Sequence, residues 1–262
     1  MKIESTQKVG FTLIELLVVI AIIAVLMGIL MPALRAAKDH ASRIHCTANV
    51  RTLDLAWTMY ATENDNRLVG GNVGGGTSWI AAPSAQNTDV EDKLNAIRSG
   101  TLWKYVKEEK VYLCPSDRRT KSAKAVSYCS YSLVGGANGE AWAGMTQARN
   151  LTDIKRPAEK YIFVEDIDTR GYNVGSWQLG FTSRRWIDPL AVWHNKRSTL
   201  GYADGHVEMH PWHDKSFLDW ADGAVEQVLS GALGTYRELA VPIDEPTDYN
   251  YMRDHYACKS HQ

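Results

Sequence analysis

Hydrophobic positions dominate residues 11–31, and the pattern changes on both sides of this run. A short polar leader, residues 1–10, precedes it, and Pro32 follows it. At a rise of about 1.5 Å per residue, about 20 apolar residues match the roughly 30 Å hydrocarbon core of a bilayer. The run is longer than the apolar region of a cleaved secretory signal, and no Ala-x-Ala-like site closes it. The pattern therefore predicts a membrane-spanning helix.

One carboxylate, Glu15, interrupts this apolar run. A charged side chain inside a spanning helix costs roughly 2.5–3.5 kcal/mol on insertion scales, so an acid at this depth indicates a function. We therefore expect Glu15 to have a positively charged partner.

Beyond Pro32 the apolar residues recur at spacings of three and four, apart from one skipped turn, which predicts a helix with one apolar stripe. The stripe consists of Leu34, Ala37, Ala41, Ile44, Ala48, Leu55 and Met59. The polar sequence TENDN at residues 62–66 supplies an end signal. We therefore expect one helix over residues 11–66, spanning the membrane to about residue 31, with the stripe of its second half packed on a globular head.

The remaining residues, 67–262, are enough for one soluble head domain with a sizeable core. A glycine-rich stretch at residues 69–78 lacks the Lys-Ser/Thr ending of a phosphate loop, so we expect a flexible loop there. Strand-like runs bounded by turn-forming residues follow at 110–114, 126–134 and 160–168.

The end of the head combines a hairpin with a helix. Residues 198–210 predict a β-hairpin around Asp204-Gly205, because this dipeptide suits a tight turn with positive φ. A short helix is expected around residues 214–229, and an irregular tail after residue 240. The elements together predict an α+β fold in which an antiparallel β-sheet packs against the long helix.

The sequence GFTLIE, at residues 10–15, resembles the cleavage and methylation signal of type IV prepilins and type II secretion pseudopilins. The resemblance implies that prepilin peptidase cuts between Gly10 and Phe11, and that the new amino group of Phe11 is N-methylated. It also gives Glu15 a partner, the positive N-terminus of a neighbouring filament subunit, which neutralises the carboxylate. Pro32 stands where many of these subunits have a helix-kinking proline, whose ring removes a helix hydrogen bond.

The charges around the span favour the opposite orientation if loop charges alone are counted. Four basic residues follow the span and two precede it: Arg35, Lys38, Arg43 and Arg51 against Lys2 and Lys8. Pseudopilins commonly continue into a basic helix outside the membrane, so the specific motif outweighs the count. We expect a single-pass inner-membrane protein with a periplasmic head, or a cell-surface filament after assembly.

A second resemblance lies in the head. CPSD at residues 114–117, and His194 followed after nine residues by Asp204-Gly205, are similar to the H-x9-D-G pilin-like proteins of planctomycetes, verrucomicrobia and lentisphaerae. With residues 46–65, this resemblance covers most of the chain. It implies a pilin-like head but no activity. From its position before the hairpin, His194 is expected to hold the turn through a hydrogen bond with Asp204.

Histidines gather near the hairpin, where His206, Glu208 and His210 alternate along the expected strand and therefore share one face. Imidazole and carboxylate groups suit zinc or a similar metal, and three nearby acids are further candidate ligands: Glu165, Asp166 and Asp168. Calcium is a separate alternative, because EDIDT at residues 165–169 offers oxygen ligands without an EF-hand pattern. A solvated edge strand gives the same alternation, so the sequence requires no cofactor.

The four cysteines are Cys46, Cys114, Cys129 and Cys258. A head outside the cytoplasmic membrane is in an oxidising compartment, where an even count indicates disulfides. Because Cys46 and Cys114 lie in the stretches that resemble the family, we expect Cys46–Cys114 with Cys129–Cys258. The local pair Cys114–Cys129 is the alternative, and a four-cysteine zinc site is not expected because no C-x2-C pair exists.

The whole sequence predicts a structural subunit of a type II secretion pseudopilus or a related type IV pilus-like filament. The expected partners are other pilin-like subunits, prepilin peptidase, a secretion platform and the inner membrane. A net charge of -1 gives no polybasic surface for nucleic acid, and no nucleophile elbow, H-E-x-x-H or paired-carboxylate motif indicates an enzyme. The alternative is a membrane-anchored periplasmic binding or metal-binding protein that does not polymerise.

Overall fold

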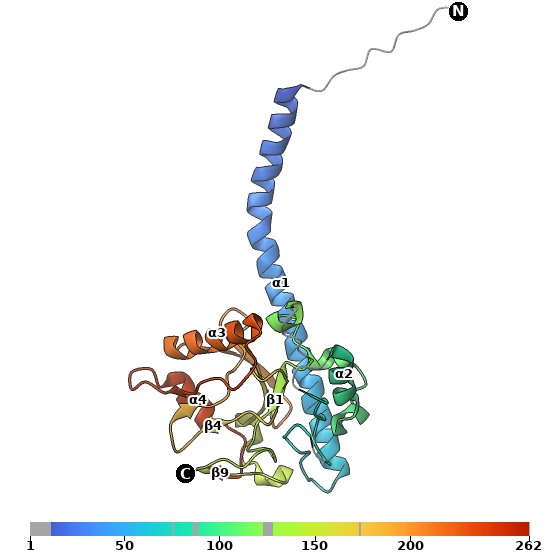
Figure 1. Ribbon diagram of the computed structural model, residues 1–262, viewed down its shortest axis with the longest axis vertical. Helices are drawn as coiled ribbons and strands as arrows, with labels where there is room; N and C mark the ends of the chain where they lie inside the picture. Colours follow the sequence, from blue (N-terminus) through green and yellow to red (C-terminus); the bar gives the residue numbers. More distant parts are fainter. Residues whose placement is uncertain (1–11, 75, 86–88, 123–127, 173, 262) are drawn as a thin grey trace, which may run out of the picture. The chain divides into compact units, whose positions relative to one another are not determined.

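The computed structural model describes residues 12–74, 76–85, 89–122, 128–172 and 174–261 (Figure 1). The chain divides into two compact units, Met1–Ala41 and Ser42–Gln262. One helix, α1, Leu13–Glu63, belongs to both units, and Pro32 lies inside it. The expected leader and the bond between Gly10 and Phe11 lie outside the described residues.

The part of α1 in the first unit is exposed. By length and composition, α1 is long and apolar enough to cross a membrane. Its large apolar side chains between Leu13 and Met31 are exposed, so the described chain itself does not cover them.

The C-terminal end of α1 is set by two residues in left-handed backbone conformations, Asp65 at φ 55° and Asn66 at φ 63°. The backbone N–H of Asn66 donates to the carbonyl oxygen of Ala61 at 2.8 Å, which satisfies one carbonyl of the last turn. The polar sequence at residues 62–66 therefore does end the helix, three residues earlier than the expected boundary.

The face of α1 that packs on the head is not the predicted stripe. The side chains of α1 that are buried in the second unit are Cys46, Asn49, Val50, Leu53, Asp54, Ala56, Trp57 and Ala61. Ile44, Ala48, Leu55 and Met59, which we call the outer stripe, are exposed instead. The helix is apolar on two faces beyond residue 42, and only tertiary contacts decide which of them is covered.

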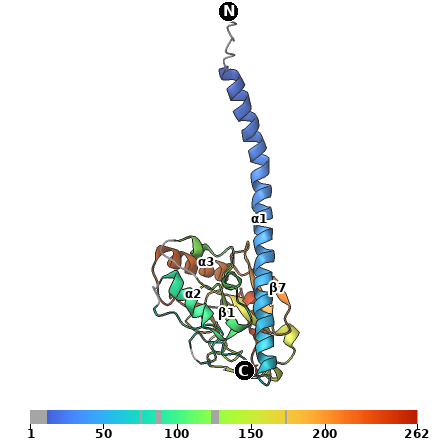
Figure 2. The same cartoon turned by 90° about the vertical axis from the view of Figure 1, so that its right-hand side faces the viewer.

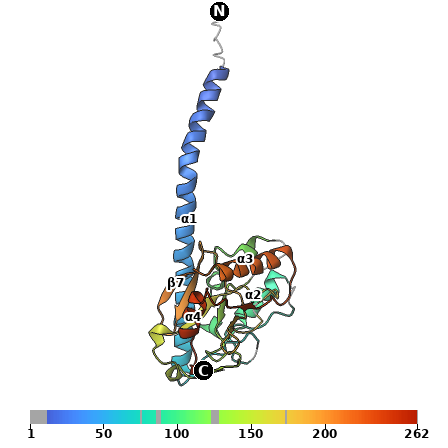
Figure 3. The same ribbon diagram turned by 90° about the vertical axis from the view of Figure 1, so that its left-hand side faces the viewer.

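The main sheet of the head is antiparallel and has the strand order β1-β3-β6-β7. Its strands are β1, Tyr131–Leu133, β3, Tyr161–Glu165, β6, Arg197–Tyr202, and β7, Val207–Pro211. In the register of the sheet, Ser132 pairs with Val164, and Val164 pairs with Leu200. The β6–β7 hairpin contacts α1, where Nη1 of Arg51 donates to the carbonyl oxygen of Gly205, and Figures 2 and 3 show β7 beside that helix.

Two smaller antiparallel sheets complete the strands of the described chain. One pairs β2, Met145–Thr146, with β9, Ser260–His261. The other has the order β4-β5-β8 and consists of Leu179–Gly180, Arg185–Trp186 and Leu239–Ala240.

Among its described residues, the head has three further α-helices: α2, Val90–Arg98, α3, Lys215–Ser230, and α4, Thr247–Asp254. The same residues include five 3-10 turns: η1, Thr101–Lys104, η2, Glu109–Tyr112, η3, Arg118–Lys121, η4, Leu151–Asp153, and η5, Pro157–Glu159. The α+β prediction is confirmed, with a long N-terminal helix and antiparallel sheets. Two local predictions are wrong: residues 110–114 contain the turn η2 instead of a strand, and the tail contains α4.

Candidate functional site

The start of α1 is a capping box made by Thr12 and Glu15. Oε2 of Glu15 accepts hydrogen bonds from the backbone N–H of Thr12 at 2.9 Å and from its hydroxyl at 2.8 Å. In return, Oγ1 of Thr12 accepts from the backbone N–H of Glu15 at 3.3 Å. The T-x-x-E spacing produces this reciprocal pair, which satisfies orphan donors at the helix start. Glu15 therefore has a local partner even in a single chain.

The hairpin turn between β6 and β7 is held by residues other than His194. Asp204 pairs with His206, with 2.6 Å between Oδ1 and Nδ1, and it also accepts the His206 backbone N–H at 3.1 Å. Gly205 has φ 88°, the left-handed conformation that glycine adopts without strain. The expected hydrogen bond between His194 and Asp204 is not formed, because His194 points into the core of the head.

The three alternating residues of the hairpin do not form a group of metal ligands. His206 stacks on Tyr202, with 4.2 Å between ring centroids, and His210 stacks on Tyr251 at 4.0 Å. Glu208 accepts a hydrogen bond from the Tyr202 hydroxyl at 3.2 Å. Burial lowers the pKa of His210 to about 4, so its ring is neutral at physiological pH. The two histidine rings thus pack on tyrosine rings, and the carboxylate is hydrogen-bonded to a tyrosine hydroxyl.

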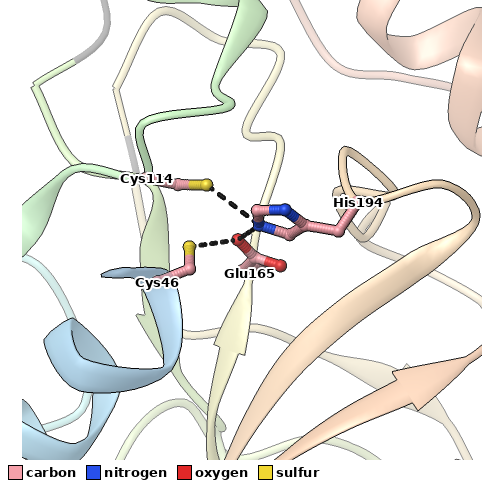
Figure 4. A group of neighbouring side chains, drawn as sticks. All are labelled: Cys46, Cys114, Glu165 and His194. Atoms are coloured by element: carbon pink, nitrogen blue, oxygen red, sulfur yellow. Dashed lines mark hydrogen bonds and ion pairs between the residues drawn. The ribbon is translucent and has the colours of Figure 1, made fainter. Parts of the chain in front are cut away.

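A different cluster of potential ligands lies inside the head (Figure 4). It consists of Cys46, Cys114, Glu165 and His194, all buried, and one donor atom from each lies within 4.8 Å of the others. Among the described residues, this is the group in which three or more such donors converge. We call it the Cys-Glu-His cluster.

Four separate segments bring the cluster together. Cys46 comes from the inner face of α1, Cys114 from the loop after η2, Glu165 from the end of β3, and His194 from the turn before β6. Sγ of Cys46 lies 2.9 Å from Oε1 of Glu165, and Sγ of Cys114 lies 3.2 Å from Nε2 of His194. Nε2 of His194 is also 3.3 Å from Oε1 of Glu165. The two thiols, the carboxylate and the imidazole thus face one another.

A shell of hydrogen-bond donors surrounds the cluster. The hydroxyl of Tyr131 lies 3.0 Å from Sγ of Cys46, and the backbone N–H of Ser116 donates to Sγ of Cys114 at 3.4 Å. The backbone N–H of Thr199 donates to Oε2 of Glu165 at 2.7 Å. Each side chain that carries a negative charge when deprotonated therefore has its own donor.

The protonation of the cluster reflects its burial and its internal contacts. Burial raises the pKa of the Cys114 thiol well above its ordinary value. Burial also lowers the pKa of His194, but interactions with Cys46 and Glu165 outweigh this effect and raise it to about 10. Nε2 of His194 and Oε1 of Glu165 thus form a buried imidazole–carboxylate contact next to the two cysteines. Nδ1 of His194 has no hydrogen-bond partner among the described residues.

No disulfide joins the four cysteines among the described residues, so none of the predicted disulfides is formed there. Cys46 and Cys114 are nevertheless brought together, as the expected pairing requires. Cys129 and Cys258 are not, because Cys129 precedes β1 while Cys258 lies beside Gly136, beyond the other end of that strand.

The sequence makes every member of the cluster a candidate but does not group the four. It places Glu165 among the possible ligands near a different set of histidines, and it assigns His194 to the hairpin turn. The acids next in sequence have other partners: Asp168 forms an ion pair with Arg170 at 2.6 Å, and Asp166 accepts a hydrogen bond from Ser132 at 2.7 Å. One signal in the sequence could have grouped these four residues. Two thiols, one imidazole and one carboxylate each lie beside a predicted element, and together they are a typical set of metal ligands.

The N-terminal segment of the chain is similar to known proteins. Residues 10–31 match the model of the prokaryotic N-terminal methylation motif. The chain is also 46% identical over 57 residues to the type IV wide pilus major component PilA4 of Thermus thermophilus, a match that covers 22% of this chain and 44% of the relative. No solved structure matches the chain.

The chain thus spans less than half the length of the curated relative that it matches. The motif lies at the start of α1, and the relative's name describes a pilus component. Together with the long apolar helix and the antiparallel sheets, they make this chain similar to type IV pilin-like proteins.

Proposed function

We propose that this protein is a subunit of a type IV pilus-like filament or of a type II secretion pseudopilus. The observation that carries the proposal is the methylation motif at residues 10–31, whose carboxylate Glu15 stands at the start of an exposed apolar helix. An apolar surface of this length needs either lipid or other helices to cover it.

Processing comes first in this proposal. Prepilin peptidase removes residues 1–10 at the Gly10-Phe11 bond, and the new amino group of Phe11 is N-methylated. The charged amino group of one subunit then approaches Glu15 of its neighbour and competes with Thr12 for the carboxylate. An intermolecular ion pair in a lipid or helix-bundle environment offsets the cost of burying either charge alone.

The outer stripe supports side-by-side assembly of helices. Ile44, Leu55 and Met59 are 58%, 60% and 43% exposed, although they are large apolar residues. They lie on the part of α1 that belongs to the second unit. In a filament, α1 of a neighbouring subunit would cover them, while the rest of the head faces outward.

Mass spectrometry of membrane-extracted protein tests the processing step. We expect an N-methylated Phe11 terminus, and we expect Gly10→Ala to block or slow maturation. An intact Met1 terminus in cells with active prepilin peptidase would contradict this step.

Shearing of the cell surface tests the filament itself. Tagged protein should appear in the sheared fraction as filaments, and should disappear from it in a strain without prepilin peptidase. Recovery of all of the mature protein as separate membrane-bound subunits would favour a membrane-anchored binding protein that does not polymerise.

A further inference from the structure

We propose that the Cys-Glu-His cluster is a structural zinc site. Its donors are Sγ of Cys46, Sγ of Cys114, Oε1 of Glu165 and Nε2 of His194. Two thiolates, one imidazole and one carboxylate are ligand types that zinc takes in proteins, and four protein ligands are the number that structural zinc sites use. Hard cations such as calcium and magnesium prefer oxygen ligands and would not select two sulfur atoms.

The distances in the cluster fit a tetrahedral ion. Zinc bonds of about 2.3 Å to sulfur and about 2.0–2.2 Å to nitrogen and oxygen place neighbouring donors roughly 3.3–3.8 Å apart. The three close donor pairs in the structure are separated by 2.9, 3.2 and 3.3 Å, and all four donors lie within 4.8 Å of one another. Zinc binding therefore requires the hydrogen-bonded pairs to separate by less than about 1 Å.

The shell around the donors suits the charge of a zinc-bound cluster. When zinc binds, the two thiols and the protonated His194 ring each give up one proton to water, and the ring binds in its neutral form. The two thiolates and the carboxylate then exceed the charge of the ion by one. Tyr131, Ser116 and Thr199 direct one O–H or N–H donor each at Cys46, Cys114 and Glu165, which stabilises this excess charge.

Burial indicates that the site is structural. Cys46, Cys114, Glu165 and His194 are at most 1% exposed, so four protein ligands enclose the ion and no position is open to a substrate. The ion would join α1, the loop after η2, strand β3 and the turn before β6. It would therefore fasten the head part of α1 to the sheet, as a Cys46–Cys114 disulfide would. The site does not depend on whether the protein forms filaments.

Metal analysis of the full-length protein in detergent tests the proposal. The protein is purified from the cell envelope without added reductant or chelator, and its zinc content is measured per chain. A second sample is stripped with a chelator under reducing conditions and titrated with Zn²⁺ and then with Co²⁺. We expect one zinc per chain, and a Co²⁺ form with tetrahedral d–d bands and sulfur-to-cobalt charge transfer.

Matched variants locate the site. Cys114→Ser, His194→Gln and Glu165→Gln should each weaken zinc binding by more than about 100-fold, because even outer-shell partners typically contribute 10–100-fold. The same type of change at Cys129 and Cys258, which are buried outside the cluster, should leave zinc content at one per chain. The wild-type Co²⁺ spectrum does not depend on whether any variant folds.

Two results would overturn the proposal. One is a Cys46–Cys114 peptide in a non-reducing map of the envelope-purified protein, which would show that the thiols form a disulfide instead. The other is a reduced, folded protein that takes up no Zn²⁺, or whose Co²⁺ spectrum lacks sulfur charge transfer.

Discussion

Gly201 of β6 lies directly against Asp54 of α1, so close that a Cβ atom at Gly201 would come within 2.6 Å of Oδ2 of the carboxylate. The same atom would lie 2.6 Å from Cγ1 of Val50 on the preceding turn of the helix. The absence of a side chain at Gly201 therefore lets the helix approach the backbone of the sheet.

Gly201→Ala should destabilise the head by about 1–3 kcal/mol, because the added methyl group overpacks this contact. Chemical denaturation of the full-length protein in detergent, followed by tryptophan fluorescence, measures the change. Gly76→Ala is the control, since a Cβ atom there meets nothing within 4 Å. Equal stabilities of the wild type and Gly201→Ala would show that α1 does not pack this tightly on β6.

Asp54→Asn should stabilise the head at neutral pH by about 1–3 kcal/mol. Asp54 is buried, neither carboxylate oxygen has a hydrogen-bond partner among the described residues, and burial raises its pKa well above the ordinary value. The folded state thus holds a proton that the unfolded state releases near pH 4, so this residue makes the wild type lose stability as pH rises above that point.

The gain in stability from Asp54→Asn should therefore be small near pH 4. It should grow as the pH rises, up to the pKa of Asp54 in the folded protein. Denaturant unfolding at a series of pH values measures it. Asp222→Asn, on the exposed side of α3, should differ from the wild type by less than about 0.5 kcal/mol at every pH. A constant difference across the pH series would mean that Asp54 is ionised in the folded protein.

Glu15→Leu should leave membrane insertion intact and reduce filament yield, because it removes both a costly charge and the proposed partner of the neighbouring amino group. Thr12→Ala separates the two roles of this carboxylate, since it removes the capping hydroxyl but keeps Glu15. We expect Thr12→Ala filaments at near wild-type yield. Sheared-fraction immunoblots, normalised to the membrane fraction, measure both variants, and an undiminished yield of Glu15→Leu would exclude an assembly role.

Leu55→Lys should leave the stability of the head within about 0.5 kcal/mol of the wild type while lowering filament yield, because Leu55 is exposed and belongs to the outer stripe. Leu53→Ala, two residues away on the buried face, should instead cost about 2–5 kcal/mol. Denaturant unfolding and shearing assays on the same two variants distinguish the faces. Loss of stability in Leu55→Lys would place the outer stripe inside the head.

The sequence was most informative where the signal is local. Apolar length predicted α1, and the Asp204-Gly205 turn predicted the β6–β7 hairpin, since both depend on neighbouring residues. The choice between the two apolar faces of α1 is not local. Leu53 and Leu55 are chemically identical, and only the approach of the sheet decides that the first is buried.

The Cys-Glu-His cluster could not be assembled from the sequence for the same reason. Cys46 and Glu165 are 119 positions apart, and Cys114 and His194 are 80 apart. No spacing rule relates donors that come from a helix, a loop, a strand and a turn. The residue types were visible as candidates, but the pairing of the segments that carry them is a property of the tertiary fold.

The contact between Arg51 and Gly205 joins residues 154 positions apart, which has a consequence for the order of folding. The inner face of α1 is synthesised early, whereas the strands that cover it, β3 and β6, come more than a hundred residues later. Contacts of such long range form slowly, and an uncovered apolar face is prone to aggregation in the meantime. Until these strands are synthesised, the inner face of α1, which includes Trp57, therefore stays uncovered, and in this interval a chaperone has the largest apolar surface to bind.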